Sequence, residues 1–512
     1  MSTRRHALAW TAGGLLAASG ASVWAQPARA TVDPLADLDG WLDAQRIGWR
    51  VPALAVALLK DGRVIYLKAF GYRDAAQSLP ANTETIFRAG SVSKAFGAAT
   101  VAMLVDEGRM AWDAPVTTYV PELRFAGGDA YGGITLRDML SHRTGLPRHE
   151  LLWYNNQSLT RQSLVARMPH LEMSAPLRAR YQYNNLMVVL AGLAVERVTG
   201  QTWEAFTRAR LLAPMGMTRV NLSAPEMAAD INHAVGHTRN GARKLVSVPL
   251  RHDPLLGPAG AVNASIGELA KWVQLQLGRG QFDGRRLIST AAMAAMWEPL
   301  VATGPAPTQA DAPRSHVGLG WRIDRYRDTL RVAHGGDLNG FTSRVVLLPE
   351  KNAGLAVLVN HGSHPLPNAV TPDLLDRLLG LRPEDHASRV MARRNAAEAV
   401  ALRFEAAASA PNGATPRPPR PHGAYVGRYS HPGYGELTVG TAGEALSVRY
   451  NDMPALLEYR QGELFETRTE RPEHGDFSGL KMSFQGDDKA GVIGIAADMQ
   501  EGVQPILFRR TA

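Results

Sequence analysis

The alternation of apolar and polar positions changes character several times along the chain. Residues 33–47 carry apolar side chains at helical spacing, and two strand-like runs follow at 53–59 and 64–70. Asp61-Gly62 separates these two runs, and Asp-Gly between apolar runs is typical of a tight hairpin. The pattern therefore predicts a helix followed by a β-hairpin.

A buried helix is predicted at 93–108, which is rich in Ala, Val, Met and Leu. Strand character returns only at 330–333, 343–348 and 354–360, after a middle region of helical segments and Gly/Pro loops. Two early and three late strands predict a single antiparallel sheet completed by both ends of one α+β domain, with helices flanking it. A polar, Pro-containing stretch at 302–315 is expected to be a surface loop.

The tail has a different pattern. A helix is predicted at 387–408, and a Pro-rich linker follows, so that the whole connection spans 386–421. Residues 422–512 alternate in strand fashion between Gly turns. We expect a small all-β domain there, and closure into a barrel would remove its exposed edges. Two roles stay open for it: shielding or narrowing a cleft, or mediating oligomerisation.

The N-terminus has the composition of an export signal. Arg4-Arg5 precede the apolar run 7–23, and Val23-Trp24-Ala25 offers a small-x-small cleavage site. We predict a signal peptide at 1–25, with the first domain at 31–385 and a periplasmic or extracellular location. The paired arginines resemble a twin-arginine signal, although general secretion stays open. An uncleaved anchor is disfavoured because the run is shorter than the roughly 20 residues of a span.

Composition excludes several function classes. The 512-residue chain contains no cysteine, which excludes disulfides, thiolate nucleophiles and Cys-based metal sites. Its net charge is +9, but the basic residues are scattered and no nucleic-acid-binding motif is present, so a solvated basic surface is expected. The close histidines His361 and His364 lack a carboxylate scaffold, and we interpret them as surface residues with no metal.

Ser91-Val92-Ser93-Lys94 carries the candidate nucleophile. Residues three apart on a helix share a face, so Lys94 would lie beside Ser91. A buried lysine near the positive end of a helix has a lowered pKa and can accept the serine proton. Taken alone, the motif is more often a helix-capping serine with a solvated lysine.

Two further motifs strengthen the interpretation. Tyr183 and Asn185 stand on a loop entering an apolar helix, where a phenol can relay a proton and an amide can orient substrate. His334-Gly335-Gly336 ends a predicted strand, and its glycines let a substrate backbone approach the strand edge. A backbone N–H there could form an oxyanion hole with that of Ser91. Taken alone, Tyr183 and Asn185 are more often turn residues, and His-Gly-Gly is more often a turn with a surface histidine.

Together, and in this order, the three motifs resemble the serine β-lactamase and penicillin-binding superfamily, whose pattern is Ser-x-x-Lys, Tyr-x-Asn and Lys/His-x-Gly. The resemblance is reinforced by residues 134–147 and 257–265, and the tail from Tyr425 resembles a lipocalin-like domain of some members. It implies a helical subdomain packed against an antiparallel sheet, and hydrolysis without a cofactor.

The resemblance also implies roles for single residues. Ser91 would be acylated, Lys94 and Tyr183 would share the acid and base work, and the backbone N–H groups of Ser91 and Asp337 would bind the oxyanion. Asn185, His334, Gly335 and Gly336 would contact substrate, whereas His142 would be structural.

The chain departs from class C β-lactamases at His334, where those enzymes carry Lys. A neutral His attracts the carboxylate of a β-lactam less, so a secreted DD-peptidase, D-amino-acid peptidase or esterase is favoured, acting on a small-molecule or peptide acyl substrate. Two alternatives stay open: a class C β-lactamase, and a penicillin- or cell-wall-binding protein that is acylated without turnover.

Overall fold

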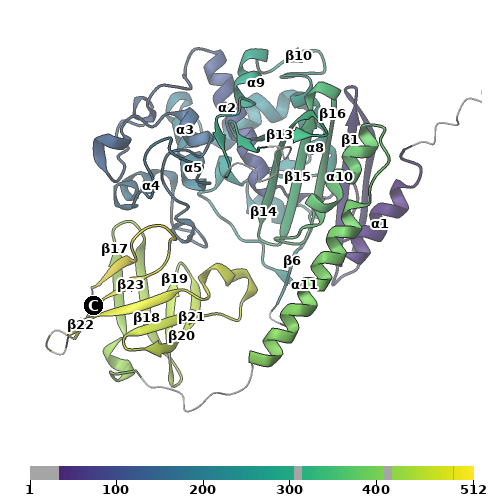
Figure 1. The fold of residues 1–512 in the computed structure, drawn as a ribbon. Helices are drawn as coiled ribbons and strands as arrows, with labels where there is room; N and C mark the ends of the chain where they lie inside the picture. The colour runs from purple at the N-terminus through teal and green to yellow at the C-terminus, as the bar shows by residue number, and fades with distance from the viewer. Residues whose placement is uncertain are drawn as a thin grey trace, which may run out of the picture.

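The computed structural model describes residues 34–240, 242–304, 314–408, 418–487, 489 and 491–511. The predicted signal peptide, the centre of the predicted 302–315 loop and most of the 409–421 linker lie outside these ranges. In the described part, a domain built on a large sheet is followed by a long helix and a separate barrel (Figure 1).

A nine-stranded antiparallel sheet organises the first domain. Both ends of the domain contribute to it, because β1 lies between the hairpin partner β2 and the late strand β16, with Leu54 opposite Val359. The strand order is β11 (Val301–Ala302), β12 (His316–Val317), β13 (Arg322–Tyr326), β14 (Thr329–Leu338), β15 (Phe341–Leu348), β16 (Ala353–Val359), β1 (Ala53–Lys60), β2 (Arg63–Asp74), β3 (Leu79–Pro80).

Helices cover both faces of the sheet. Alternate residues of β1 face opposite sides: Leu54, Val56 and Leu58 pack with α1 and α10, and Ala55 and Ala57 belong to the core shared with α2 and α8. The helices are α1 (Leu38–Gly48), α2 (Ser93–Asp106), α3 (Leu136–Leu140), α4 (Arg161–Arg167), α5 (Asn185–Thr199), α6 (Trp203–Thr207), α7 (Ala224–Ala229), α8 (Ile266–Leu277), α9 (Thr290–Met296), α10 (Leu366–Leu378), α11 (His386–Ala408).

Short strand pairs complete this domain. Strand β8 joins β4 to β5, and β6 and β7 and likewise β9 and β10 form small hairpins. Their bounds are β4 (Phe87–Arg88), β5 (Val220–Asn221), β6 (Gly236–Arg239), β7 (Leu245–Val248), β8 (Asn263–Ala264), β9 (Gln281–Phe282), β10 (Arg285–Arg286).

The tail forms a closed eight-stranded barrel. Aromatic side chains fill its interior, and eight of them are buried: Tyr425, Tyr429, Tyr434, Tyr450, Phe465, Phe477, Phe484, Phe508. The strands are β17 (Gly427–His431), β18 (Gly435–Ala442), β19 (Ala445–Tyr450), β20 (Met453–Gln461), β21 (Leu464–Arg468), β22 (Lys481–Asp487), β23 (Gly491–Ala497), β24 (Ile506–Arg510). Closure leaves no unpaired sheet edge, as the sequence predicts.

The α+β fold class with a following barrel is confirmed, with local differences. Helix α1 begins at Leu38 instead of residue 33. The sheet also contains β11, β12, β13 and β3, which the apolar pattern missed because three of these strands are only two residues long. Strand β14 continues past the His-Gly-Gly motif to Leu338 instead of ending at the motif. Both glycines are therefore strand residues, and Gly336 lets the backbone of Ala89 approach.

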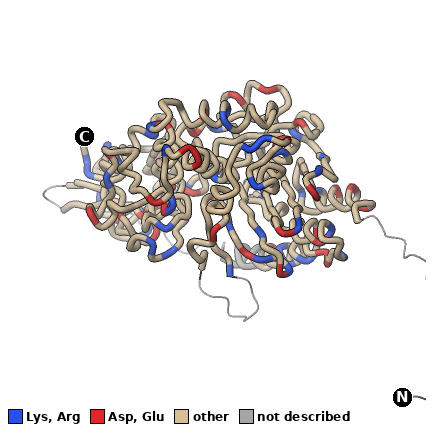
Figure 2. The backbone as a smooth tube through the Cα atoms, turned by 90° about the horizontal axis from the view of Figure 1, so that it is seen from above, with Lys and Arg blue, Asp and Glu red and all other residues tan. Residues whose placement is uncertain are grey.

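Charged residues are spread over both domains. Figure 2 shows Lys and Arg interspersed with Asp and Glu along the chain, in keeping with the scattered basic residues of the sequence. Within the described ranges, none of the helices combines the length and the apolar character that a membrane span requires.

Candidate active site

The candidate nucleophile lies on a tight turn ahead of α2. Residues Gly90–Val92 form a 3-10 turn, so Ser91 precedes the α-helix that begins at Ser93. Gly90 has a φ of +52°, which favours glycine. The Ser93 hydroxyl donates to the Gly90 carbonyl over 2.7 Å and accepts from the N–H of Val262 over 2.9 Å. The turn is thereby fixed, with Ser91 at the cleft.

Lys94 is fully buried behind Ser91. Its Nζ lies 3.0 Å from Ser91 Oγ and donates to the carbonyl oxygen of Ala259 over 2.8 Å. Burial lowers the pKa of the Lys94 ammonium to about 7, while nearby Glu150 raises it and Arg148 lowers it further. Near neutral pH a substantial fraction of Lys94 is an amine with a lone pair available to Ser91.

Tyr183 approaches Ser91 from the segment before α5. Its hydroxyl donates to Ser91 Oγ over 2.7 Å, and burial raises the pKa of this phenol well above its usual range. The tyrosine therefore keeps its proton. Because Ser91 Oγ accepts from Tyr183, the serine hydrogen is free to point at Lys94, which is the direction that base catalysis requires.

His142 supports this segment from behind, in line with the structural role predicted for it. The ring is buried, its Nδ1 accepts from the N–H of Asn184 over 3.2 Å, and its centroid lies 4.5 Å from that of Tyr183. Asn184 caps α5 by accepting from Met187 N over 2.9 Å. The start of the helix and the tyrosine are thus held by one set of contacts.

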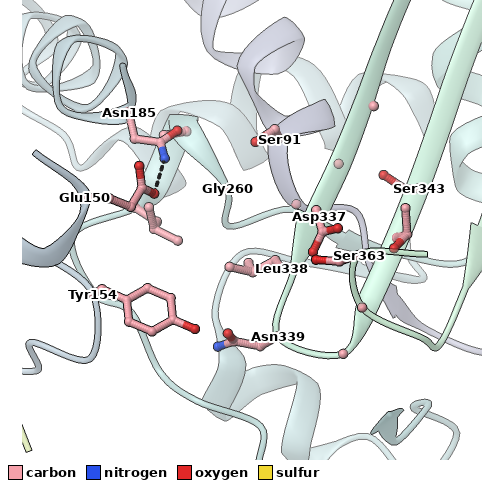
Figure 3. A pocket seen from close by; sticks show the side chains of 18 of the residues that line it. Ser91, Glu150, Tyr154, Asn185, Gly260, Asp337, Leu338, Asn339, Ser343 and Ser363 are labelled. Carbon is pink, nitrogen blue, oxygen red and sulfur yellow. Dashed lines mark hydrogen bonds between the residues drawn. The ribbon is translucent and has the colours of Figure 1, made fainter. Parts of the chain in front are cut away.

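Asn185 is the first residue of α5 and faces the cleft together with a residue that the sequence did not reveal (Figure 3). Its Nδ2 donates to Glu150 Oε1 over 2.9 Å, and its buried Oδ1 has no hydrogen-bond partner among the described residues. Among the same described residues, no hydrogen bond joins Asn185 to Lys94. The amide therefore offers an acceptor to a substrate N–H.

Glu150 and Arg148 are functional candidates that sequence reasoning missed. Glu150 lies three residues beyond Pro147, where the recognisable Gly-Leu-Pro stretch ends, so only its place in a cleft-forming turn could have identified it. Burial raises the pKa of its carboxyl group, against the effects of Arg148 and Lys94. Arg148 pairs with Glu150 over 2.8 Å and lies 5.1 Å from the centre of the Tyr183 ring.

His334 lies in the middle of β14, buried at the cleft floor. Its Nδ1 lies 2.6 Å from the Gly335 carbonyl, which can only accept, so Nδ1 carries the proton and Nε2 is an acceptor. Burial, followed by the charge of Lys94, lowers the pKa of His334 to about 3. The imidazole is therefore neutral at physiological pH and supplies no positive charge.

Gly336 and Gly90 let β14 touch the Ser91 turn. A β-carbon at Gly336 would lie 1.9 Å from the carbonyl oxygen of Ala89, and one at Gly90 would lie 3.0 Å from the nitrogen of Asp337. The hydroxyl of Ser343 also donates to Ala89 O over 2.7 Å. The backbone nitrogen of Asp337 therefore lies beside the Ser91 turn, and its N–H stays the predicted second oxyanion donor.

A large cleft surrounds these residues, with a volume of about 1560 Å³. Its lining includes all the predicted site residues except Lys94, which lies underneath. The barrel contributes to its wall through Asp452, Arg471, His474, Gly475 and Asp476. Small-molecule pockets are usually about 300–1000 Å³, so this cleft has room for a peptide.

Arg344 is a further missed cation in this cleft. It lies opposite Gly335 in the β14–β15 ladder, and its Nη1 lies 3.5 Å from the position of a β-carbon on that glycine. Burial, followed by Arg331, lowers the pKa of the guanidinium to about 10. Its Nε is buried, and no hydrogen bond or ion pair of Arg344 is found within the described ranges. Such a cation favours an anionic ligand.

The two histidines His361 and His364 are buried, which corrects the expectation of surface residues. Their rings lie 4.5 Å apart, and burial lowers the pKa of His361 to about 4. Across the described residues, no group of three or more His, Asp or Glu side chains is arranged to hold a metal ion.

Comparison with known proteins agrees with the motifs. The Beta-lactamase family model matches residues 38–379, and a domain of unknown function, DUF3471, matches residues 411–510. Unguisins hydrolase ungD' of Aspergillus campestris is 28% identical over 413 residues, covering 76% of this chain and 75% of that protein. Protein flp of Staphylococcus aureus is 24% identical over 353 residues, covering 67% and 66%.

Solved structures share the two-part fold. The octameric penicillin-binding protein homologue from Pyrococcus abyssi aligns with a TM-score of 0.61 at 23% identity, covering 92% of this chain and 99% of that one. SurE aligns with a TM-score of 0.54 at 19% identity, covering 92% and 98%. The family model spans well over half of the chain. The chain therefore belongs to the β-lactamase family of hydrolases.

Proposed function

We propose that the protein is an exported serine hydrolase that cleaves an amide or ester of a peptide through an acyl-enzyme on Ser91. One observation carries this proposal: Lys94 Nζ and the Tyr183 hydroxyl lie 3.0 and 2.7 Å from the same Ser91 Oγ. A lone helix-capping serine would need neither neighbour.

The proposed reaction has two halves. The Lys94 amine takes the Ser91 proton as Oγ attacks the carbonyl carbon, and the N–H groups of Ser91 and Asp337 stabilise the oxyanion. Tyr183 donates its proton to the departing amine or alkoxide and is reprotonated from Lys94. Water then attacks the acyl-enzyme, with the same groups returning the proton to Ser91.

A DD-peptidase, D-amino-acid peptidase or esterase is favoured within this class. Neutral His334 leaves the third motif without the positive charge of Lys, and the cleft has room for a peptide. One SurE structure was solved with D-Leu, which makes D-leucine amides and esters the first substrates to test. An exported location follows from the predicted signal peptide, and no nucleic-acid partner is proposed.

A second candidate function is reaction with β-lactams, either as a β-lactamase or as a penicillin-binding protein without turnover. Arg344 favours it, because this guanidinium lies beside Gly335, makes no ion pair among the described residues and can replace the missing motif cation in binding a carboxylate.

Intact-mass measurement over time tests these proposals. Purified protein is mixed with penicillin or with a D-leucine ester, alongside Ser91→Ala and the control Ser289→Ala, whose serine caps α9 away from the cleft. We expect a covalent adduct in the wild type and in Ser289→Ala only. Rapid decay of the penicillin adduct indicates a β-lactamase and persistence indicates a DD-peptidase. Turnover retained by Ser91→Ala would refute the proposed nucleophile.

A further inference from the structure

The turn that carries Glu150 contacts the barrel as well as its own domain. His149 precedes Glu150 and has a φ of +45°, and its buried ring lies between the two domains. Its Nε2 lies 3.0 Å from the carbonyl oxygen of Glu172, and its Nδ1 lies 2.8 Å from the hydroxyl of Tyr434 in the barrel.

The protonation of His149 follows from these partners. A carbonyl can only accept, so Nε2 donates to Glu172 O and Nδ1 accepts from the Tyr434 hydroxyl. Burial lowers the pKa of this imidazole to about 4, so the neutral form persists through the physiological range. The N–H of His149 also donates to the side chain of Gln500 in the barrel. Both its side chain and its backbone thus contact the barrel.

Asn451 of the barrel holds the other end of the same turn. Its Nδ2 donates to the carbonyl of Leu151 over 2.8 Å and lies 3.3 Å from those of Leu152 and Tyr154, while its own carbonyl accepts from Asn155 over 2.7 Å. The last carbonyls of a helical turn lack partners within the turn. A barrel side chain therefore caps the turn Glu150–Leu152.

Close packing keeps the two domains together at this place. A β-carbon at Gly433 would lie 3.0 Å from the side chain of Leu171 and 3.1 Å from the carbonyl oxygen of His170. Arg167 donates to the Gly433 carbonyl over 3.2 Å. The barrel loop thus packs tightly against the domain surface, and small displacements are resisted.

We infer that the barrel is a positioning element of the active site: Tyr434 and Asn451 hold the 149–155 turn so that Glu150 meets Asn185 and lies close to Lys94. This rests on the proposed hydrolase function. Removal of these contacts is expected to let Glu150 move away from Asn185, so that the amide loses its orientation and Lys94 loses the carboxylate that raises its pKa. Neither barrel residue touches the reacting atoms.

Two matched variants of the full-length protein test the inference. Tyr434→Phe removes the hydroxyl that reaches His149, and its control Tyr429→Phe removes a buried hydroxyl that donates to Tyr425 O within the barrel. We expect a tenfold or larger loss of kcat/KM for a D-leucine ester in Tyr434→Phe and less than twofold in Tyr429→Phe. Equal effects in both would show that barrel stability alone is involved.

A double-mutant cycle separates positioning from general destabilisation. Asn451→Ala is expected to lower kcat/KM and to move the acid limb of its pH profile toward that of Glu150→Gln. In a Glu150→Gln background the same Asn451→Ala change is expected to have little further effect. Full additivity, or an unchanged pH profile, would overturn the inference.

Hydrogen exchange gives a readout that does not depend on activity. The N–H groups of Leu152, Trp153 and Tyr154 donate within the turn and should exchange faster in Asn451→Ala than in Tyr429→Phe. If the wild type hydrolyses no ester while exchange changes as expected, the proposed function fails and the barrel still holds the turn. Active protein with unchanged exchange refutes the inference itself.

Discussion

Arg148 and Glu150 should shift the pKa of Lys94 in opposite directions. Lys94 Nζ lies 4.8 Å from the centroid of the Tyr183 ring and the Arg148 guanidinium lies 5.1 Å from it, so these two cations are at most about 10 Å apart. Removing the Arg148 charge favours protonated Lys94, whereas removing the Glu150 charge favours the free amine. Arg148→Gln and Glu150→Gln therefore form an opposed pair of variants.

The size of the effect follows from Coulomb's law. Two unit charges about 10 Å apart interact by about 1.7 kcal/mol at an effective dielectric constant of about 20, which corresponds to slightly more than one pKa unit. The Arg148 side chain is 52% exposed, so solvent screening reduces this. We expect Arg148→Gln to raise the pKa of Lys94 by about half a unit to one unit.

The assay is kcat/KM against pH for a D-leucine ester, because its limbs report the ionisations of the free enzyme. Lys94 must be neutral to act as the base, so activity should rise through a pKa of about 7 in the wild type. The acid limb should move to higher pH in Arg148→Gln and to lower pH in Glu150→Gln. Ser91→Ala measures background hydrolysis at each pH.

Added salt provides an internal check. The shift of the acid limb in Arg148→Gln should become smaller at high ionic strength. The shift in Glu150→Gln should change less, because the Glu150 side chain is only 21% exposed. The reasoning is refuted if both variants move the acid limb in the same direction, or if neither moves it while kcat/KM remains measurable. In either case Lys94 is not the group that titrates in the profile.

Three further predictions concern other parts of the site. Gly336→Ala should lower the melting temperature and abolish acylation, because its β-carbon would lie 1.9 Å from Ala89 O; wild-type acylation by this variant would contradict the strand contact. Arg344→Gln should slow acylation by penicillin about tenfold or more, as measured by intact mass, because the guanidinium would bind its carboxylate. The rate of acylation by a neutral ester should be nearly unchanged. Equal slowing of both reactions would exclude a carboxylate site at Arg344. Burial opposes it, but Arg178 and Arg143 lower the pKa of the fully buried Asp138. The stability from this carboxylate is therefore present above its ordinary pKa of 3.8 and is lost as pH falls further. Because the Arg178 side chain is half-exposed, Asp138→Asn should cost about 1.5–3 kcal/mol at pH 7 in chemical denaturation, and a negligible cost would refute a stabilising role for these ion pairs.

The sequence predicts the parts of the site that carry fixed motifs. Ser91, Lys94, Tyr183 and His334 stand in short patterns whose spacing reflects local geometry, and the structure brings all four together. Glu150 has no such pattern, because its place depends on a turn held by another domain. The spacing within a motif predicts which side chains are local neighbours, whereas a single sequence does not predict contacts between two domains.

The same distinction applies to the fold. The hairpin β1–β2 is local, and Asp61 and Gly62, with φ values of 50° and 74°, form the turn that the sequence predicts. The two-residue strands β11 and β12 depend on pairing partners instead of on an apolar pattern of their own. Arg344 is likewise a cleft residue only because of its register opposite Gly335.

The central position of β1 has a consequence for how the chain folds during synthesis. Leu54 pairs with Val359, so one side of an early strand that is apolar from Ala53 to Leu59 stays without its partner until some 300 further residues have been made. Loop closure over that length is slow, and the exposed strand edge is open to aggregation meanwhile. A ribosome-bound chain ending before Ala353 should therefore depend on a chaperone, and release of the last sheet strand, β16, should convert it abruptly to a protease-resistant domain.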